Sequence, residues 1–224
     1  MSARVRARRG AAFYVGLGLV LAGLALLGYV AWQFLGTNVV SERKQRSLVE
    51  KTEQTWRAAA PRGDHATGGA ELPGTADALI RIPRFGRDYV MPVQEGVSDS
   101  VLAEGFGHFE HSAEPGQKGN YALAAHRVTH GQPLRQMPEL RPGDTVVVET
   151  REATYTYALD TDPNDLVVTF RDVWVVDPKP VNPDPAGVQA PDDARLITLT
   201  TCAELFHTDK RMIAFGHLVS STPR

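Results

Sequence analysis

Cysteine is the scarcest chemically useful residue in this chain: Cys202 is the one cysteine among 224 residues. A disulfide within the chain is therefore excluded. A cysteine without a partner is either a buried, inert side chain or a working nucleophile. The remaining sequence has to decide between these two interpretations.

Clusters of positive charge are also scarce. Four arginines stand at the N-terminus, and without them the formal net charge changes from −2 for the whole chain to −6 from Gly10 onward: Arg4, Arg6, Arg8 and Arg9. No block rich in Lys and Arg follows, so we expect no nucleic-acid partner. Internal repeats are absent as well.

Charge is missing altogether between Ala11 and Leu35. A helix of this length, rising 1.5 Å per residue, can cross a hydrocarbon core of ~30 Å. Arginines precede the run and mixed charges follow it, which predicts a cytoplasmic N-terminus and an extracellular domain. The run is too long for the apolar region of a cleaved signal peptide, and its end is bulky where a peptidase needs small residues. We interpret it as an uncleaved anchor in the cell membrane, so Cys202 is expected where thiols normally form disulfides.

The sequence divides into four regions. We expect a cytoplasmic tail at 1–10, a transmembrane anchor at 11–35, an extracytoplasmic helix and linker at 36–77, and one folded domain at 78–221. The linker is charged and compatible with a helix at first, then becomes rich in Ala, Gly and Pro, as in a flexible tether. The last region has the usual size of a single domain.

Short apolar runs broken by Gly and Pro dominate the folded region. The expected strands are 79–82, 89–91, 121–125, 145–149, 154–157, 173–176, 196–200 and 212–215. Helical turns are expected within 97–105 and 134–140. Many short strands with few helices predict a mainly β fold, a closed or nearly closed barrel.

Three residues with useful chemistry stand at ends of these strands. Cys202 ends one strand, Arg211 begins the next, and His126 ends a third. At one rim of a barrel, a thiol, an imidazole and a guanidinium can form an acyl-transfer site. Each also has a structural explanation on its own: a buried cysteine, a hydrogen-bonded histidine, a solvated arginine.

The arrangement of these residues resembles a known family. Thr198-Leu-Thr-Thr-Cys202, with Arg211 nine residues later and Ala124-Ala-His-Arg127 upstream, resembles the sortases, the membrane-anchored cysteine transpeptidases of Gram-positive bacteria. The resemblance covers residues 79–218. It implies an eight-stranded sortase-type β-barrel with short helices, preceded by a transmembrane helix, and makes 78–221 the catalytic domain.

The resemblance also implies a reaction. Cys202 would be the nucleophile, His126 the general acid, and Arg211 the group that positions the substrate and the oxyanion. The expected reaction is cleavage after Thr in an LAxTG- or LPxTG-like sorting signal of a surface protein. An amine of lipid II or peptidoglycan would then resolve the thioacyl-enzyme. No cofactor is expected.

Four further residues are assigned to the substrate and oxyanion site. Thr201 lies where sortases place part of the oxyanion hole, and Thr200 precedes it. His207, in the loop after the thiol, is a rival imidazole and a candidate groove residue. Class E sortases of high-GC actinobacteria tend to carry Tyr on the strand of Tyr121 and to accept LAxTG, so the resemblance favours class E.

Three other interpretations remain open at this stage. An L,D-transpeptidase also pairs Cys and His, but it places His, Gly, Cys and Arg close around the thiol, unlike the sequence around Cys202. A plain cysteine peptidase would use the same residues. A membrane-tethered β-barrel binding module would keep Cys202 buried and inert.

Metal sites were also considered, and none is expected. His126 and His130 have the spacing of a zinc-protease helix, but Arg127 replaces the required Glu and a third ligand is missing. His108 and His111 lie near three acidic residues, Glu104, Glu110 and Glu114. Without a loop of regularly spaced oxygen ligands, this segment is interpreted as a solvated acidic turn.

The linker contains a sequence similar to a sorting signal. Leu72-Pro-Gly-Thr-Ala76 differs from LPxTG in its last residue. Chance similarity in a Pro/Gly-rich tether is the default interpretation. The alternative is a pseudosubstrate that transiently occupies the substrate groove.

Overall fold

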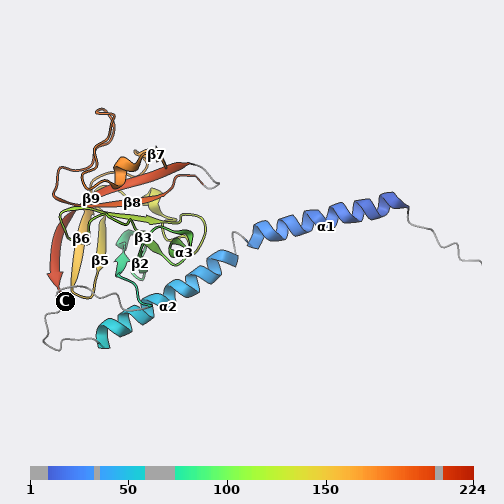
Figure 1. The fold of residues 1–224 in the computed structure, drawn as a ribbon, viewed down its shortest axis with the longest axis horizontal. Coiled ribbons are helices and arrows are strands. Elements are labelled where there is room, and N and C mark those ends of the chain that lie inside the picture. Colours follow the sequence, from blue (N-terminus) through green and yellow to red (C-terminus); the bar gives the residue numbers. More distant parts are fainter. Residues whose placement is uncertain (1–9, 33–35, 59–73, 205–208) are drawn as a thin grey trace, which may run out of the picture.

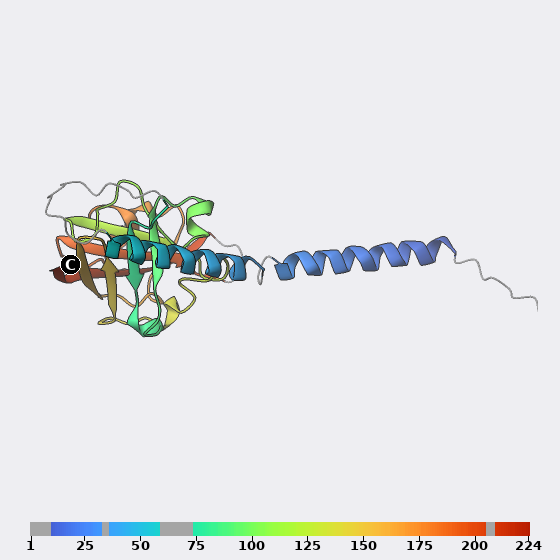
Figure 2. The ribbon, with the colours of Figure 1, turned by 90° about the horizontal axis from the view of Figure 1, so that it is seen from below.

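The computed structural model describes residues 10–32, 36–58, 74–204 and 209–224. Two long helices, α1 (Ala11–Ala31) and α2 (Thr37–Ala58), precede a β-barrel. Helix α1 extends away from the barrel, whereas α2 lies along its side (Figures 1 and 2). The predicted mainly β fold behind an N-terminal apolar helix is confirmed.

Helix α1 is apolar on all sides. Within the described part of the chain, Ala12–Ala31 is the helix that is long and apolar enough to cross a membrane, with a mean hydropathy of 2.1. Its large side chains are exposed and have no protein face to cover them. A helix of this kind is stable where lipid rather than water surrounds it.

The barrel contains eight strands, and a ninth lies outside the ring. The strands are β1 (Ala78–Arg81), β2 (Met91–Glu95), β3 (Phe106–His108), β4 (Gly119–Ala125), β5 (Thr145–Glu149), β6 (Ala153–Leu159), β7 (Val167–Thr169), β8 (Arg195–Cys202) and β9 (Lys210–Pro223). The ring runs β6-β5-β1-β2-β3-β4-β8-β9 and closes through pairing of β6 with β9, while β7 extends the edge of β9. The β2–β3 and β4–β8 pairs are parallel.

Strand β9 closes the ring because it changes partners along its length. Its first part pairs with β8, and from Gly216 onward it pairs with β6. A Cβ atom at Gly216 would lie 2.5 Å from the carbonyl oxygen of Ala158. Glycine is therefore required where the two strands approach each other at the point of closure.

Alternation along the strands separates two hydrophobic layers. Side chains such as Leu123, Ile197 and Leu199 point into the barrel and form its core. Ile213 and Phe215 point outward and are covered by the 3₁₀ helix η4 (Val173–Val176) and the chain around it. Each large apolar side chain buried in this way contributes ~1.5–3 kcal/mol before conformational entropy is subtracted.

Four strand predictions need correction: the strand predicted at 89–91 starts only at Met91 as β2, the one at 173–176 is not a strand, and β3 and β7 were not predicted. The run at 173–176 was predicted as a strand and forms η4, because an apolar run of four residues fits a strand and a buried helical turn equally well. Strand β3 was missed, since it is three residues long and contains a glycine. The predicted helical turns appear as α3 (Asp99–Leu102) and the 3₁₀ helix η3 (Met137–Glu139); another 3₁₀ helix, η2 (Pro83–Phe85), lies between β1 and β2.

Helix α2 forms as expected from the charged segment after the anchor, and it packs on the barrel. One stripe is buried, comprising Ser41, Gln45, Val49 and Thr52. Val49 contacts a small cluster with Ala76 and Leu79 at the start of β1. The backbone N–H of Ala76 donates a hydrogen bond of 2.9 Å to the Thr52 hydroxyl.

Candidate active site

The strand register brings Cys202 and Arg211 together. Both are paired directly across β8 and β9, so their side chains leave the same face of the sheet. The parallel β4–β8 pair ends with Ala124 opposite Thr200. Continuing that register by two residues sets His126 beside Cys202. We call these three residues a row: Cys202 and Arg211 are a pair on β8 and β9, and His126 directly follows the end of β4.

This row lies on the outer face of the barrel wall. Leu199 points into the core, whereas Thr198 points outward and donates hydrogen bonds to the Asn120 side chain (2.8 Å) and to the Val175 carbonyl in η4 (3.2 Å). Side chains alternate along a strand, so Cys202 shares the face of Thr198. Its thiol is partly exposed.

The two threonines before the cysteine have different positions. Thr201 is buried, and its hydroxyl donates a 2.7 Å hydrogen bond to the carbonyl of Ala125. This bond joins the end of β8 to the residue just before His126. Thr200 is buried on the same face as Cys202. The tie from Thr201 therefore fixes the spacing between the strand ends that carry the thiol and the imidazole.

His126 lies in a water-poor environment. Its Nε2 atom is buried and has no hydrogen-bond partner among the residues that the structure describes. Burial, with a smaller contribution from the nearby His130, lowers the pKa of His126 from 6.5 to about 4. The two rings stack with centroids 4.6 Å apart. At neutral pH the imidazole of His126 is therefore uncharged and can accept a proton.

Arg211 holds the far side of the row. It pairs with Cys202 on one side and with Val168 of β7 on the other. One of its terminal nitrogens donates a 3.0 Å hydrogen bond to the carbonyl of Lys210. A guanidinium on the residue paired with Cys202 can supply positive charge on this face of the sheet.

Among the predicted site residues that the structure describes, the side chains of Tyr121 and Thr201 fall outside this row, because alternation turns both to the opposite face from Cys202. Tyr121 is 2% exposed and points into the barrel core, where its ring lies 4.8 Å from that of His108. It precedes His126 by five positions, an odd number, so alternation turns it to the opposite face. Its assignment to the substrate site is corrected on this ground. His207 lies outside the described residues.

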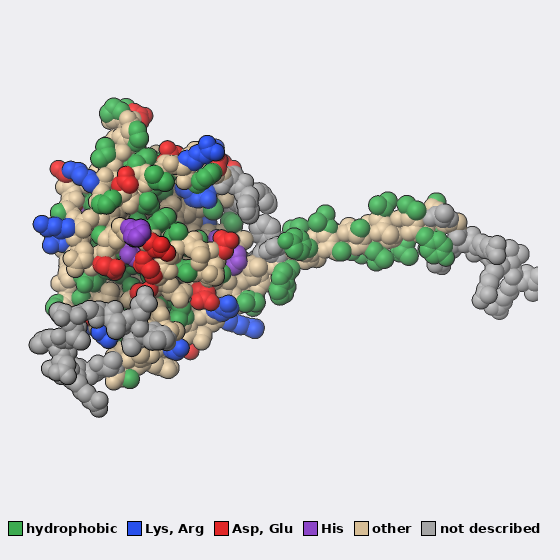
Figure 3. Space-filling view, viewed as in Figure 1, with side chains coloured by type: hydrophobic (Ala, Val, Ile, Leu, Met, Phe, Trp, Pro, Cys, Tyr) green, Lys and Arg blue, Asp and Glu red, His purple; other side chains and the backbone are tan. Residues whose placement is uncertain are grey.

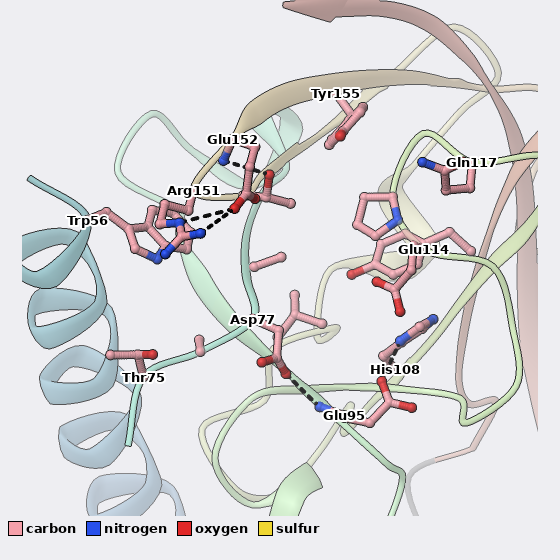
Figure 4. Close-up of a pocket in the computed structure, with 16 residues that line it drawn as sticks. Trp56, Thr75, Asp77, Glu95, His108, Glu114, Gln117, Arg151, Glu152 and Tyr155 are labelled. Carbon is pink, nitrogen blue, oxygen red and sulfur yellow. Dashed lines mark hydrogen bonds and ion pairs between the residues drawn. The ribbon is translucent and has the colours of Figure 1, made fainter. Parts of the chain in front are cut away.

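A cavity of about 560 Å³ opens at the other end of the barrel, around Tyr121 and the start of β1. Figure 4 shows Glu95 and Glu114 pointing toward His108 at this end. Asp and Glu side chains gather around a histidine on this face of the barrel (Figure 3). The cavity is thus acidic, and it lies on the far side of the barrel from Cys202.

The acidic group differs from the one considered in the sequence. Ligand-type atoms of Glu95, His108 and Glu114 lie within 4.8 Å of one another. Glu95 was missed because it becomes a neighbour of His108 only through the parallel β2–β3 register. Both ring nitrogens of His108 already have partners: Nδ1 contacts Glu95 at 2.7 Å, and Nε2 contacts Ser112 at 2.8 Å.

The chain matches known proteins over most of its length. The sortase domain model matches residues 80–219. Sortase SrtE1 of Streptomyces coelicolor is 34% identical over 219 residues, and the match covers 94% of this chain but 58% of SrtE1. The chain thus spans less than two thirds of that relative. Sortase SrtE2 of the same species is 28% identical over 90% of this chain and 79% of its own length.

Solved structures agree with the sequence relatives. Sortase E from Streptomyces avermitilis is 38% identical with a TM-score of 0.56, covering 66% of this chain and 90% of its own. Sortase E1 from Streptomyces coelicolor, solved with a tripeptide in the active site, is 36% identical with a TM-score of 0.56 and covers 69% and 94%.

A closed eight-stranded barrel with a free cysteine at a strand end defines the general class, a β-barrel thiol enzyme. The matches narrow it further: the chain belongs to the sortase family, whose members are cysteine transpeptidases. Its relatives by sequence and structure include class E sortases, the class that the resemblance favoured on the basis of Tyr121. The family acts on proteins that carry a sorting signal and on amine acceptors.

Proposed function

We propose that Cys202, His126 and Arg211 are the catalytic residues of a transpeptidase that cleaves an LAxTG- or LPxTG-like signal after Thr. The acyl group is transferred to an amine of a cell-wall precursor, lipid II or peptidoglycan. The observation that supports this proposal is the cross-strand pair of Cys202 and Arg211 on β8 and β9, with His126 directly after the end of the neighbouring strand β4.

The first half of the reaction follows from the uncharged state of His126. The imidazole accepts the proton of the Cys202 thiol, and the thiolate attacks the Thr carbonyl carbon of the signal, forming a C–S bond. Arg211 stabilises the negative oxygen of the tetrahedral intermediate. The imidazolium then gives its proton to the leaving amine as the C–N bond breaks, which leaves a thioester.

The second half reverses these roles. The acceptor amine attacks the thioester carbonyl, a new C–N bond forms and the C–S bond breaks. The proton lost by the amine passes through His126 to the departing sulfur, which restores the starting thiol. Thr201 holds the ends of β4 and β8 at a fixed spacing and contributes to the oxyanion site, while Thr200 and His207 line the substrate groove.

The enzyme is proposed to be a single-pass protein of the cell membrane. Helix α1 lies within the anchor at 11–35, and the arginines of the 1–10 tail favour a cytoplasmic N-terminus. The linker at 36–77 and the catalytic domain at 78–221 then lie outside the cell. This placement brings the thiol to the compartment where surface proteins and wall precursors meet.

The test uses the full chain in detergent micelles with LAxTG and LPxTG peptides, with and without a glycine-type amine. We expect release of the C-terminal peptide fragment and, with the amine present, a mass-identified acyl-amine product. Cys202→Ala should abolish both while its circular dichroism spectrum stays unchanged. Turnover by Cys202→Ala would refute the proposal. Fragment release without any amine product would identify a peptidase instead.

A further inference from the structure

The chain segment that follows β4 is held by helix α2. The Gln45 side-chain amide donates a 2.9 Å hydrogen bond to the carbonyl of His130. The backbone N–H of Gly131 donates a 2.9 Å bond to the side-chain oxygen of Asn38. We call residues 126–133 the His126 loop. Two adjacent residues of this loop are therefore hydrogen-bonded to a helix that lies more than 80 positions earlier in the chain.

The face of α2 that contacts the His126 loop is polar. An apolar face would be sufficient if the helix only packed against the loop. Gln45 is 2% exposed, and Ser41 one turn earlier is also buried. Burying an amide is costly unless it is hydrogen-bonded, and here the bonded partner is the loop carbonyl. The other amide atom, Oε1, has no partner among the described residues. The contact therefore selects one position of the loop rather than simply covering it.

The loop residues that contact α2 have an unfavourable backbone conformation. His130, Gly131 and Gln132 have φ values of 54°, 77° and 53°. The left-handed region is unfavourable for residues other than glycine, and such a run persists only where surrounding contacts enforce it. A Cβ at Gly131 would lie 2.5 Å from the Gln45 amide oxygen, so helix and loop are in close contact. The conformation of the loop thus depends on α2.

The loop contacts His126 through a stacked ring and through a backbone hydrogen bond. The ring of His130 stacks on the ring of His126, and the N–H of Leu134 closes the loop on the carbonyl of His126 at 3.0 Å. We propose that Asn38 and Gln45 are positioning residues, which hold the His126 loop so that the imidazole faces Cys202. The inference rests on the catalytic role proposed for His126. The positioning contact also lies close to the anchor in the chain. Asn38 follows Trp32 by six residues, and a chain of six residues spans at most about 21 Å.

The test compares variants of the full chain in detergent micelles, with an LAxTG peptide and an amine. Gln45→Met keeps the length of the side chain and removes the donor. We expect kcat to fall about tenfold with KM within about twofold, because a misplaced imidazole slows chemistry rather than binding. Hydrogen exchange in the 126–133 peptide should become faster. The control Gln54→Ala, on the exposed face of the same helix, should match wild type in every measurement.

Variants of Asn38 separate hydrogen bonding from general damage. Asn38→Leu removes the acceptor for Gly131 and should resemble Gln45→Met. Asn38→Asp keeps an acceptor oxygen and should retain kcat within about twofold. If both Asn38 variants lose activity equally, the bond to Gly131 is not what positions the loop.

A pair of glycines supplies a second, independent test. Gly131 and Gly143 both have positive φ, but a Cβ at Gly143 meets nothing within 4 Å. Both Ala variants carry the backbone strain, and only Gly131→Ala collides with Gln45. We expect Gly131→Ala to lose kcat about tenfold and Gly143→Ala to stay close to wild type. Equal losses would contradict a specific contact with α2.

The outcomes separate this inference from the proposed function. One outcome would overturn the positioning role alone: wild type is active, and Gln45→Met has the same kcat and the same hydrogen exchange in the His126 loop as wild type. A fall in kcat that tracks a general loss of thermal stability, without faster exchange confined to the loop, would also overturn it. An inactive wild type would count against the proposed function, and loop exchange would still decide whether α2 holds the loop.

Discussion

The two ends of the barrel each carry a histidine, His108 at one end and His126 at the other, and the surroundings of the two rings differ. At the cavity end, His108 has partners at both ring nitrogens, including the carboxylate of Glu95. At the thiol end, the Nε2 of His126 has no partner among the described residues, and burial lowers its pKa to about 4. An imidazole with partners at both nitrogens stabilises a fold, whereas His126, whose Nδ1 contacts Thr129 at 3.4 Å, keeps its Nε2 as a site for a proton.

The contrast extends to the groups around each ring. The environment of His108 is acidic and includes Glu114, while the strand row beside His126 contains Arg211 and a thiol. Unsatisfied buried polar atoms are rare in folded proteins and tend to mark functional sites. The difference supports the proposal that the chemistry takes place at the thiol end.

The largest expected effect comes from removing His126, and it is compared with removing His108. His126→Ala should lower kcat by at least about a hundredfold, because no other described group stands in the row to carry the proton. The matched variant His108→Ala should keep kcat within a few-fold and lower thermal stability instead, since it removes a buried imidazole that contacts Glu95 and Ser112. Peptide turnover and thermal unfolding of both variants check the prediction. A catalytic loss in His108→Ala equal to that in His126→Ala would erase the distinction.

Arg211→Ala should also cost at least about a hundredfold in kcat/KM, through loss of charge next to the developing oxyanion. Lys210→Ala is the control, because Lys210 is exposed, adds the same charge one position earlier and points to the opposite face of β9. Steady-state kinetics at two salt concentrations separate a local effect from a general electrostatic one. If both variants lose activity alike, net charge rather than the row is responsible.

The sequence predicted the three strand ends but not what joins them. Cys202 and Arg211 lie on consecutive strands, so their proximity follows from a simple antiparallel connection. His126 reaches Cys202 through a parallel pair whose partners are 76 positions apart, and no local pattern specifies such a register. The grip of Gln45 on the His126 loop was invisible for the same reason.

Two errors had signals that were present in the sequence. Tyr121 lies at an odd spacing from His126 on the same strand, and period-two alternation places it on the inner face whatever the family preference. Residues 173–176 form an apolar run without alternation, which packs equally well as a helical turn. In both cases a local geometric rule was more reliable than similarity or hydrophobicity alone.

The lowered pKa of His126 should make the stability of the protein depend on pH in the acid range. In the unfolded chain this group takes up a proton near pH 6.5, and in the folded chain near pH 4. Between these values the unfolded state binds more protons, so stability falls as pH falls. The difference in unfolding free energy between wild type and His126→Gln should change by roughly 3 kcal/mol from pH 7.5 to 4, measured by urea titration. A constant difference across this range would contradict the lowered pKa.

The smallest expected effect concerns the tie between the strand ends. Thr201→Val keeps the shape of the side chain and removes the hydroxyl that donates to Ala125. A buried carbonyl left without its partner costs ~1–2 kcal/mol, so we expect a stability loss of this size in urea titration. Because Ala125 directly precedes His126, kcat should fall a few-fold more than stability alone explains. Thr52→Val is the control, because it also removes a buried hydroxyl with a hydrogen bond, here accepted from the Ala76 N–H at 2.9 Å, but on helix α2. A stability loss in Thr201→Val with unchanged kcat would show that the tie holds the barrel and not the spacing of the row.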